Sequence, residues 1–424
     1  MAIKTAIAHQ DHTKMARPQL LLCGLLLYTT IYYLQIGSRV SALGNIRIEF
    51  LVGIAMVVFS AISLHGNHGI DIETRRIIAP ICWFIAAAIA SIPTTVAGFN
   101  TINMLIFFFK SFSVFVMIMA AVKSEKGLKA YIYFLVLMMA FVLIEAKMTG
   151  NMHNSSGLLR LNAVTLLFAH PNALGGLGAA CIPLLYYLFK YHKNIIAKVA
   201  ILVTAAIVFI AVTMTQSRSA IVGIVAFVFY VWTMSKKKSL SAAMIFLVAV
   251  IAWTSLDDVT KERYQSISDT EAVVSGHETS ETDRSIAKRY EIILDGFRLF
   301  IQRPINGFGI GGYQTARIER LGRWQVCHCA YVQTLSELGL LGFIPWMLIL
   351  SRTYLLFSKT RKKILDESNI EHFRFIYQMT YAFQANLVVH FVLSLFGHSP
   401  YDNYWWIASA ISLKLHYFVN KETI

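Results

Sequence analysis

Long apolar runs, separated by short polar connections, recur along almost the whole chain. Most are about 17 to 25 residues long, the length of helix that crosses a lipid bilayer. This pattern predicts an all-α, polytopic membrane protein with about twelve transmembrane helices. The predicted spans are about 19–37, 49–64, 77–97, 102–122, 129–146, 172–190, 195–214, 219–234, 239–254, 333–357, 374–395 and 402–419.

One long polar connection, residues 255–332, interrupts the pattern. It separates an N-terminal bundle of about nine spans (1–254) from about three C-terminal spans (333–424), within one integrated domain. Its first half, Ser266 to Thr282, is rich in Ser, Thr, Asp and Glu and is expected to be mobile.

Its second half predicts an amphipathic helix that lies on the membrane surface or against the bundle. The apolar face consists of Ile286, Tyr290, Ile293, Phe297 and Phe300, and the polar face of Lys288, Glu291, Asp295, Arg298 and Gln302. Pro304 ends this helix, and the glycine-rich stretch 306–312 predicts a tight turn.

Composition and charge support a membrane protein. Of the 424 residues, 56% are apolar and 14% are charged, whereas a soluble domain carries about 25% charged residues. Basic residues gather in alternating connections: Lys4, Lys14 and Arg17; Arg75 and Arg76; Lys123, Lys126 and Lys129; Lys190, Lys193 and Lys198; Lys236 to Lys238; and Lys359 to Lys363. The positive-inside rule therefore places both termini in the cytoplasm and the long connection outside. This topology and attraction to anionic lipid explain the net charge of +15 without nucleic-acid binding.

Arg218 is the first candidate for chemistry, in the polar segment Thr215–Ala220 between two spans. A guanidinium stays charged and is costly near hydrocarbon, so an arginine there usually has an anionic partner. Arg289 lies on the flank of the apolar face of the amphipathic helix, where it either extends to the membrane surface or grips a phosphate.

His328 lies shortly before the tenth predicted span, on the same predicted side of the membrane as Arg218 and Arg289. An imidazole can act as a base near neutral pH, and the alternative is a structural role at a helix start. Lys110, within the fourth span, either belongs to a functional site or extends to the membrane surface. Arg160 and Asn172, in the connection before the sixth span, are further candidates for substrate contact. Cys327 and Cys329 lack a second ligand pair at zinc spacing, so no metal site is predicted.

The order of these motifs resembles the O-antigen ligase and O-antigen polymerase superfamily. The resemblance rests on the segment around Arg218, on Arg289 followed by Arg303–Pro304 and Gly307–Gly309, and on His328 before Gly339–Gly342. One departure is Cys329, where many members have asparagine after the histidine.

The resemblance implies a glycosyltransferase of the bacterial inner membrane, with its active site facing the periplasm. Arg218 and Arg289, with Lys110, would bind the pyrophosphate of a polyprenyl-linked glycan donor, and His328 would activate a sugar hydroxyl. Fixed arginines stabilise the leaving pyrophosphate without a metal or other cofactor, and back-side attack inverts the anomeric centre.

The acceptor distinguishes two enzymes. A polymerase extends lipid-linked repeat units, as in lipopolysaccharide or exopolysaccharide biosynthesis, with a chain-length regulator as a possible partner. A ligase attaches the glycan to lipid A-core. The modest outer loop, mixed in charge, slightly favours the polymerase.

The alternative from another class is a polytopic transporter or lipid flippase. Such a fold predicts two six-span halves with a long connection between them. Here the long connection follows the ninth predicted span, which favours the transferase.

Overall fold

The computed structural model describes residues 19–64, 71–155, 158–235, 238–239, 281–397 and 400–422. All but the first residue of the predicted ninth span (239–254), and most of the segment Ser266 to Thr282, lie outside this part.

Each of the other predicted spans coincides with a helix. The principal helices are Gln19–Leu34, α4 (Ile48–Leu64), α5 (Ile72–Ala90), α6 (Phe99–Ala121), α7 (Glu125–Thr149), α8 (Pro171–Tyr191), α9 (Ile195–Met214), α10 (Arg218–Met234), α16 (Ala330–Asp366), α17 (Arg374–Leu393) and α18 (Asn403–Glu422). The short elements between them are α2 (Ile36–Arg39), α3 (Ser41–Asn45), η1 (Ile92–Thr94), β1 (Met152–Ser155), β2 (Leu158–Leu161), η2 (Leu166–Phe168), α14 (Glu281–Gln302) and α15 (Tyr313–Leu321).

Six of the described segments are long and apolar enough to cross a membrane: α5 with η1, α6, α7, α8, α9 and α16. Gln19–Leu34, α4 and α10 are shorter apolar helices. The predicted count of twelve spans is therefore not confirmed. α17 and α18 are less apolar because they lie inside the bundle, where Gln384 and Asn386 of α17 and Ser409 and Ser412 of α18 are buried.

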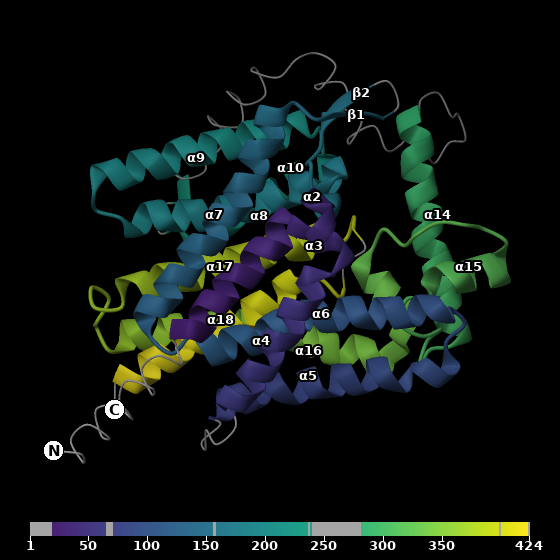
Figure 1. Cartoon of the computed structure of the whole chain (residues 1–424), viewed down its shortest axis with the longest axis horizontal. Coiled ribbons are helices and arrows are strands. Elements are labelled where there is room, and N and C mark those ends of the chain that lie inside the picture. The colour runs from purple at the N-terminus through teal and green to yellow at the C-terminus, as the bar shows by residue number, and fades with distance from the viewer. Residues whose placement is uncertain are drawn as a thin grey trace.

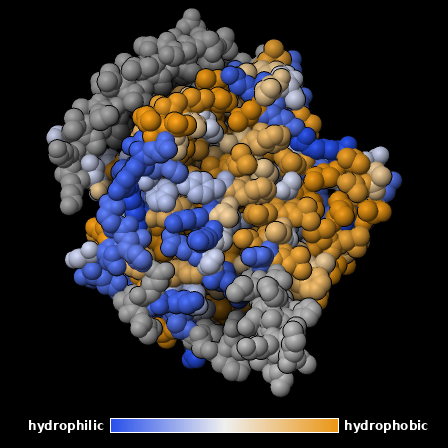
Figure 2. Space-filling view, turned by 60° about the vertical axis from the view of Figure 1, so that its left-hand side comes forward, coloured by the Kyte–Doolittle hydropathy of each residue, from blue (hydrophilic) through white to orange (hydrophobic). Residues whose placement is uncertain are grey.

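Large apolar side chains cover the outward faces of several helices. On α9, Ile195, Ile196 and Leu202 are exposed, and α4 exposes Phe59 and Ile62. Figure 2 shows a broad hydrophobic area on one side of this view and hydrophilic atoms mainly on the other. Exposed apolar area on this scale indicates a surface that contacts lipid.

The buried centre is formed by α8, α17, α16 and α18. α8 packs against α7, α9, α10 and α17, while α16 packs against α5, α14, α17 and α18. The basic connections meet at one end of this bundle: Lys193 pairs with Glu371 at 3.2 Å, and Lys359 pairs with Glu73 at 2.6 Å. This is the arrangement expected if those connections lie on one side of a membrane.

The opposite end carries β1, β2, α14 and α15 (Figure 1). The antiparallel hairpin of β1 and β2 pairs His153 with Arg160, and the sequence had not predicted any strand. Four-residue strands give too short an alternating pattern to stand out between long apolar runs.

α14 is the predicted amphipathic helix, but its interior face differs from the prediction. Asp295, expected on the outer polar face, is fully buried and pairs with Arg317 of α15 at 2.9 Å and Arg298 at 2.9 Å. α15 covers this side of α14, and paired arginines offset the cost of burying the carboxylate. Two residues of the predicted apolar face, Tyr290 and Phe297, are instead exposed.

α16 is broken at Gly339, whose φ of 59° is left-handed. The chain from Pro304 to Gly309 packs into this break: Leu340 N donates to Pro304 O at 2.8 Å, and Gly309 N donates to Glu337 O at 2.8 Å. A Cβ on Gly339 would lie 2.3 Å from Ile305 O. The glycine-rich stretch 306–312 therefore packs against the glycines at 339–342. The backbone groups that lose their helical hydrogen bonds at the break form new ones with this stretch.

Candidate active site

A cavity of about 810 Å³ opens among the connections at the end of the bundle that carries α14 and α15. Its walls come from the segments before α8, before α16 and between α17 and α18. Apolar side chains of α7, α8 and α17, among them Met139, Leu184 and Phe383, line the part that reaches into the bundle. The cavity thus joins a polar mouth to an apolar interior.

One wall of the cavity is built around Arg160, which is 6% exposed. Its Nε donates to Thr215 O at 2.9 Å, and its Nη2 donates to Asn172 Oδ1 at 2.6 Å. Asn172 lines the cavity, whereas Arg160 is not among the lining residues. Arg160 therefore connects β2, the turn after α9 and the start of α8.

The starts of α8 and α10 meet in this wall. His170 caps α8 by accepting from Asn172 N at 3.2 Å, and Ser217 caps α10. Gly175 allows the close approach, because a Cβ there would lie 2.9 Å from the Cβ of Ser217. Two helix N-termini then face one region, where their dipoles favour an anion.

Arg218 is the first residue of α10 and is partly buried. Ser219, next in the chain, lines the cavity, and Arg218 itself is not among the lining residues. Binding of substrate by Arg218 therefore stays a prediction.

His328 lines the cavity from the segment that leads into α16. This segment is fixed to the end of α17: Ala330 N donates to Ser394 O at 2.8 Å, and Tyr331 Oη donates to Phe391 O at 2.9 Å. Beside it, Cys327 is buried and its Sγ donates to Cys329 O at 3.3 Å. Burial raises the pKa of the Cys327 thiol, which favours the protonated sulfur.

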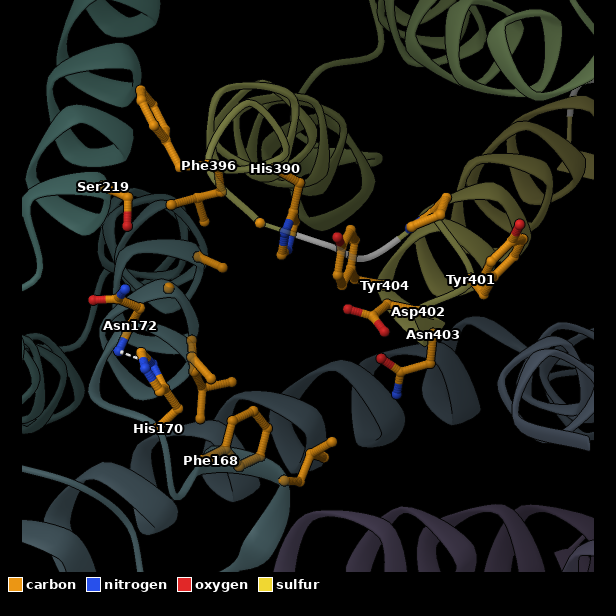
Figure 3. Close-up of a pocket in the computed structure, with 18 of the residues that line it drawn as sticks. Phe168, His170, Asn172, Ser219, His390, Phe396, Tyr401, Asp402, Asn403 and Tyr404 are labelled. Atoms are coloured by element: carbon orange, nitrogen blue, oxygen red, sulfur yellow. Dashed lines mark hydrogen bonds between the residues drawn. The ribbon is translucent and has the colours of Figure 1, made fainter. Parts of the chain in front are cut away.

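The wall opposite Asn172 contains residues that the sequence analysis did not select. Figure 3 shows Asp402, Asn403, Tyr404 and His390 on this side, facing His170 and Asn172 across the cavity. Burial raises the pKa of the Asp402 carboxyl to about 7, so it exchanges a proton near neutrality. In sequence Asp402 resembles a solvated loop residue, and the packing of α17 and α18 at the centre of the bundle leaves it half-buried.

Glu337, 1% exposed, holds three segments around the cavity. Its carboxylate accepts from Tyr401 Oη at 2.7 Å, Gly311 N at 2.9 Å and Gln333 Nε2 at 3.0 Å. Tyr401 directly precedes Asp402, and Gln333 lies in the first turn of α16, five residues after His328. This buried carboxylate therefore fixes the backbone near His328 and Asp402, which both line the cavity.

Arg289 and Lys110 lie on helices near the cavity but do not line it. Arg289 is partly buried on α14, one turn before Ile292, which clusters with the cysteines that flank His328. Lys110 lies at the middle of α6, with its Nζ 5.8 Å from the ring centre of Phe50 in α4. Neither side chain lines the cavity, so their binding of substrate stays a prediction.

Residues 203–347 match the family model of O-antigen ligase. The match confirms the resemblance to the O-antigen ligase and polymerase superfamily. A comparison with curated proteins finds no significant match.

The O-antigen ligase segment runs from α9 into α16 and contains Arg218, Arg289, His328 and Glu337. Asn172, His390 and Asp402 lie outside it and reach the same cavity through the fold. Among the described residues, no three His, Cys, Asp or Glu side chains are grouped as ligands of one metal ion.

Proposed function

We propose that the chain is a membrane glycosyltransferase that moves a glycan from a polyprenyl-pyrophosphate carrier to a sugar hydroxyl. The observation that carries this proposal is a single cavity whose two polar walls differ in chemistry. Asn172, which Arg160 holds, and Ser219, which follows Arg218, lie on one side of it with two helix N-termini. Asp402 lies across the cavity from them, and His328 also lines it.

The first wall suits the pyrophosphate of the donor. Arg218 would supply a planar fork of N–H donors at the start of α10, where the helix dipole adds positive potential. Arg289 and Lys110 would contribute further positive charge. The leaving pyrophosphate gains charge as the glycosidic bond breaks, and fixed donors stabilise it without a metal ion.

His328 would accept the proton of the acceptor hydroxyl. The hydroxyl oxygen then attacks the anomeric carbon, the bond from that carbon to the pyrophosphate oxygen breaks, and polyprenyl pyrophosphate leaves. Attack opposite the leaving group inverts the anomeric centre. An ionised Asp402 would stabilise the imidazolium that forms, as a carboxylate does for a protonated base.

The identity of the acceptor distinguishes a polymerase from a ligase. We slightly favour a repeat-unit polymerase, and the test is to supply the purified protein with lipid-linked repeat units alone. Growth of a glycan ladder without lipid A-core excludes a pure ligase. Transfer only after lipid A-core is added excludes the polymerase.

A transporter or flippase predicts a different outcome for His328→Ala. The transferase should lose glycan transfer by about 10²–10⁴-fold, the contribution of a general base. A transporter could continue to move the lipid-linked substrate across the membrane in the same variant. Undiminished transfer by His328→Ala would contradict the proposed role of this residue.

A further inference from the structure

Two stacked rings form part of the cavity wall that faces Asn172. Tyr404 and His390 lie face to face, with ring centroids 3.7 Å apart and planes 5° from parallel. Both residues line the cavity, and Figure 3 shows them beside Asp402. The proposed chemistry has used Asp402 and assigns no role to these rings.

The stack is held rigidly from behind. Trp405, 1% exposed, contacts Tyr404 at 4.5 Å and His390 at 6.0 Å between ring centroids. Trp405 also meets the buried Trp346 of α16 edge to face at 5.7 Å. Rings fixed in this way lose little freedom when a ligand packs against them.

The groups beside the stack indicate the class of ligand. Asp402 and Asn403 flank Tyr404 and line the same cavity, so hydrogen-bonding groups lie next to a flat aromatic surface. A sugar needs this combination, because its C–H face packs on the negative face of an aromatic ring and its hydroxyls need polar partners. A phosphate would be repelled by an ionised Asp402, and a polyprenyl tail would leave Asp402 and Asn403 without partners.

The position of the stack distinguishes the acceptor from the donor. His390 lies one turn before Ser394, whose carbonyl accepts from Ala330 N, two residues after His328. The candidate base and the stack therefore share one side of the cavity. The protein groups proposed to bind the pyrophosphate, at the starts of α8 and α10, lie across the cavity from the stack.

We propose that Tyr404, backed by His390, is the platform on which the acceptor sugar stacks while its hydroxyl faces His328. This inference rests on the proposed transferase function. It adds a binding subsite for a neutral sugar ring, in which Asp402 and Asn403 hold hydroxyls at the edge of the ring.

The test uses the full-length protein in lipid nanodiscs and two substrates. The donor is the polyprenyl-pyrophosphate oligosaccharide of the source cells. The acceptor is the same oligosaccharide joined to an octyl chain, which has no leaving group and can only accept. Tyr404→Leu should raise the KM for the octyl glycoside about tenfold, roughly the value of a lost stacking contact. Its kcat and its KM for the donor should change by less than about threefold.

Two further variants make the result specific. Tyr404→Phe keeps the ring and should recover most of the lost affinity for the octyl glycoside. Tyr417→Leu removes an exposed tyrosine from the same helix, away from the cavity, and should leave both KM values unchanged. A KM increase for the donor alone would assign the platform to the donor glycan, and an unchanged acceptor KM in Tyr404→Leu would overturn the proposal.

Binding separates failure of the platform from failure of the transferase function. If the wild-type protein forms no product, tryptophan fluorescence can still follow binding of the octyl glycoside. Weaker binding in Tyr404→Leu than in Tyr404→Phe would then keep the sugar platform while the transfer reaction is abandoned. Equal binding by both variants would reject the platform independently of catalysis.

Discussion

At the scale of single residues, the two arginines near the α8 start have different surroundings. Arg160 is almost fully buried and uses two of its nitrogens on Thr215 O and Asn172 Oδ1. Arg218 is only partly buried at the start of α10. We infer that Arg160 positions Asn172, whereas Arg218 is the better placed of the two to meet a substrate.

Arg218→Lys should therefore reduce transfer while leaving expression intact. The change keeps the positive charge but removes the planar fork that binds two phosphate oxygens. Loss of one charge-assisted hydrogen bond, about 1.5–3 kcal/mol, lowers the transfer rate about 10- to 100-fold. The measurement is the initial rate with lipid-linked donor. Arg39→Lys, which changes a partly exposed arginine paired with Glu145, is the matched control. A wild-type rate for Arg218→Lys would show that bidentate phosphate binding by Arg218 is not part of the mechanism.

Asp402 gives a prediction for the dependence of activity on pH. Its carboxyl pKa is raised to about 7, so acidification through neutrality protonates it and removes its negative charge. Loss of this charge should make activity fall as the pH decreases. His170 and His390 line the same cavity and have no assigned role in this step.

Asp402→Asn should make the acid side of the pH–rate profile less steep. The variant has a lower maximal rate, and the titration of this carboxyl no longer contributes to the loss of activity on acidification. Initial rates from mildly acidic to mildly alkaline pH measure this slope. A profile identical in shape to that of the wild type would mean that Asp402 does not titrate in the reaction.

At the scale of elements, the sequence predicted the helices well and their mutual packing poorly. Long apolar runs locate α9 and α10 almost to the residue, because a helix in lipid must satisfy its own backbone. The burial of Asp295 and the partial burial of Asp402 depend on which elements cover them, and no local sequence pattern predicts this. The glycines at 307 and 339 were visible as a motif, but their contact with each other was not.

Gly339→Ala tests the packing of the 304–309 segment into the break of α16. The new Cβ would meet Ile305 O at 2.3 Å and would require a φ of 59° from alanine. We expect a loss of about 3 kcal/mol in unfolding free energy, from overpacking and left-handed strain together. Gly322→Ala is the control, since it also has positive φ but nothing within 4 Å of the new Cβ. It should lose only about 1 kcal/mol. Equal thermal shifts for the two variants would show that backbone strain alone matters at Gly339.

At the scale of the whole molecule, the proposal requires the cavity to face away from the basic connections. Lys193, Glu371 and the other residues of those connections meet at one end of the bundle. α15 and the cavity lie at the other end, and α16 runs between the two, from Ala330 to Asp366. From the positive-inside rule we expect the cavity on the extracytoplasmic side, where the proposed reaction would take place.

Cysteine labelling in sealed spheroplasts tests this orientation. Cys23 and Cys82 are exposed and would first be replaced by serine, whereas Cys181, Cys327 and Cys329 are buried and should not react. A membrane-impermeant maleimide should then label Glu319→Cys on α15 in sealed spheroplasts, because that position is exposed at the cavity end. Glu371→Cys, with a side chain 78% exposed at the opposite end, should be labelled only after the membrane is permeabilised. The reverse pattern would place His328 and Asp402 in the cytoplasm, where an externally exposed lipid-linked glycan cannot reach them, and the transferase mechanism would have to be abandoned.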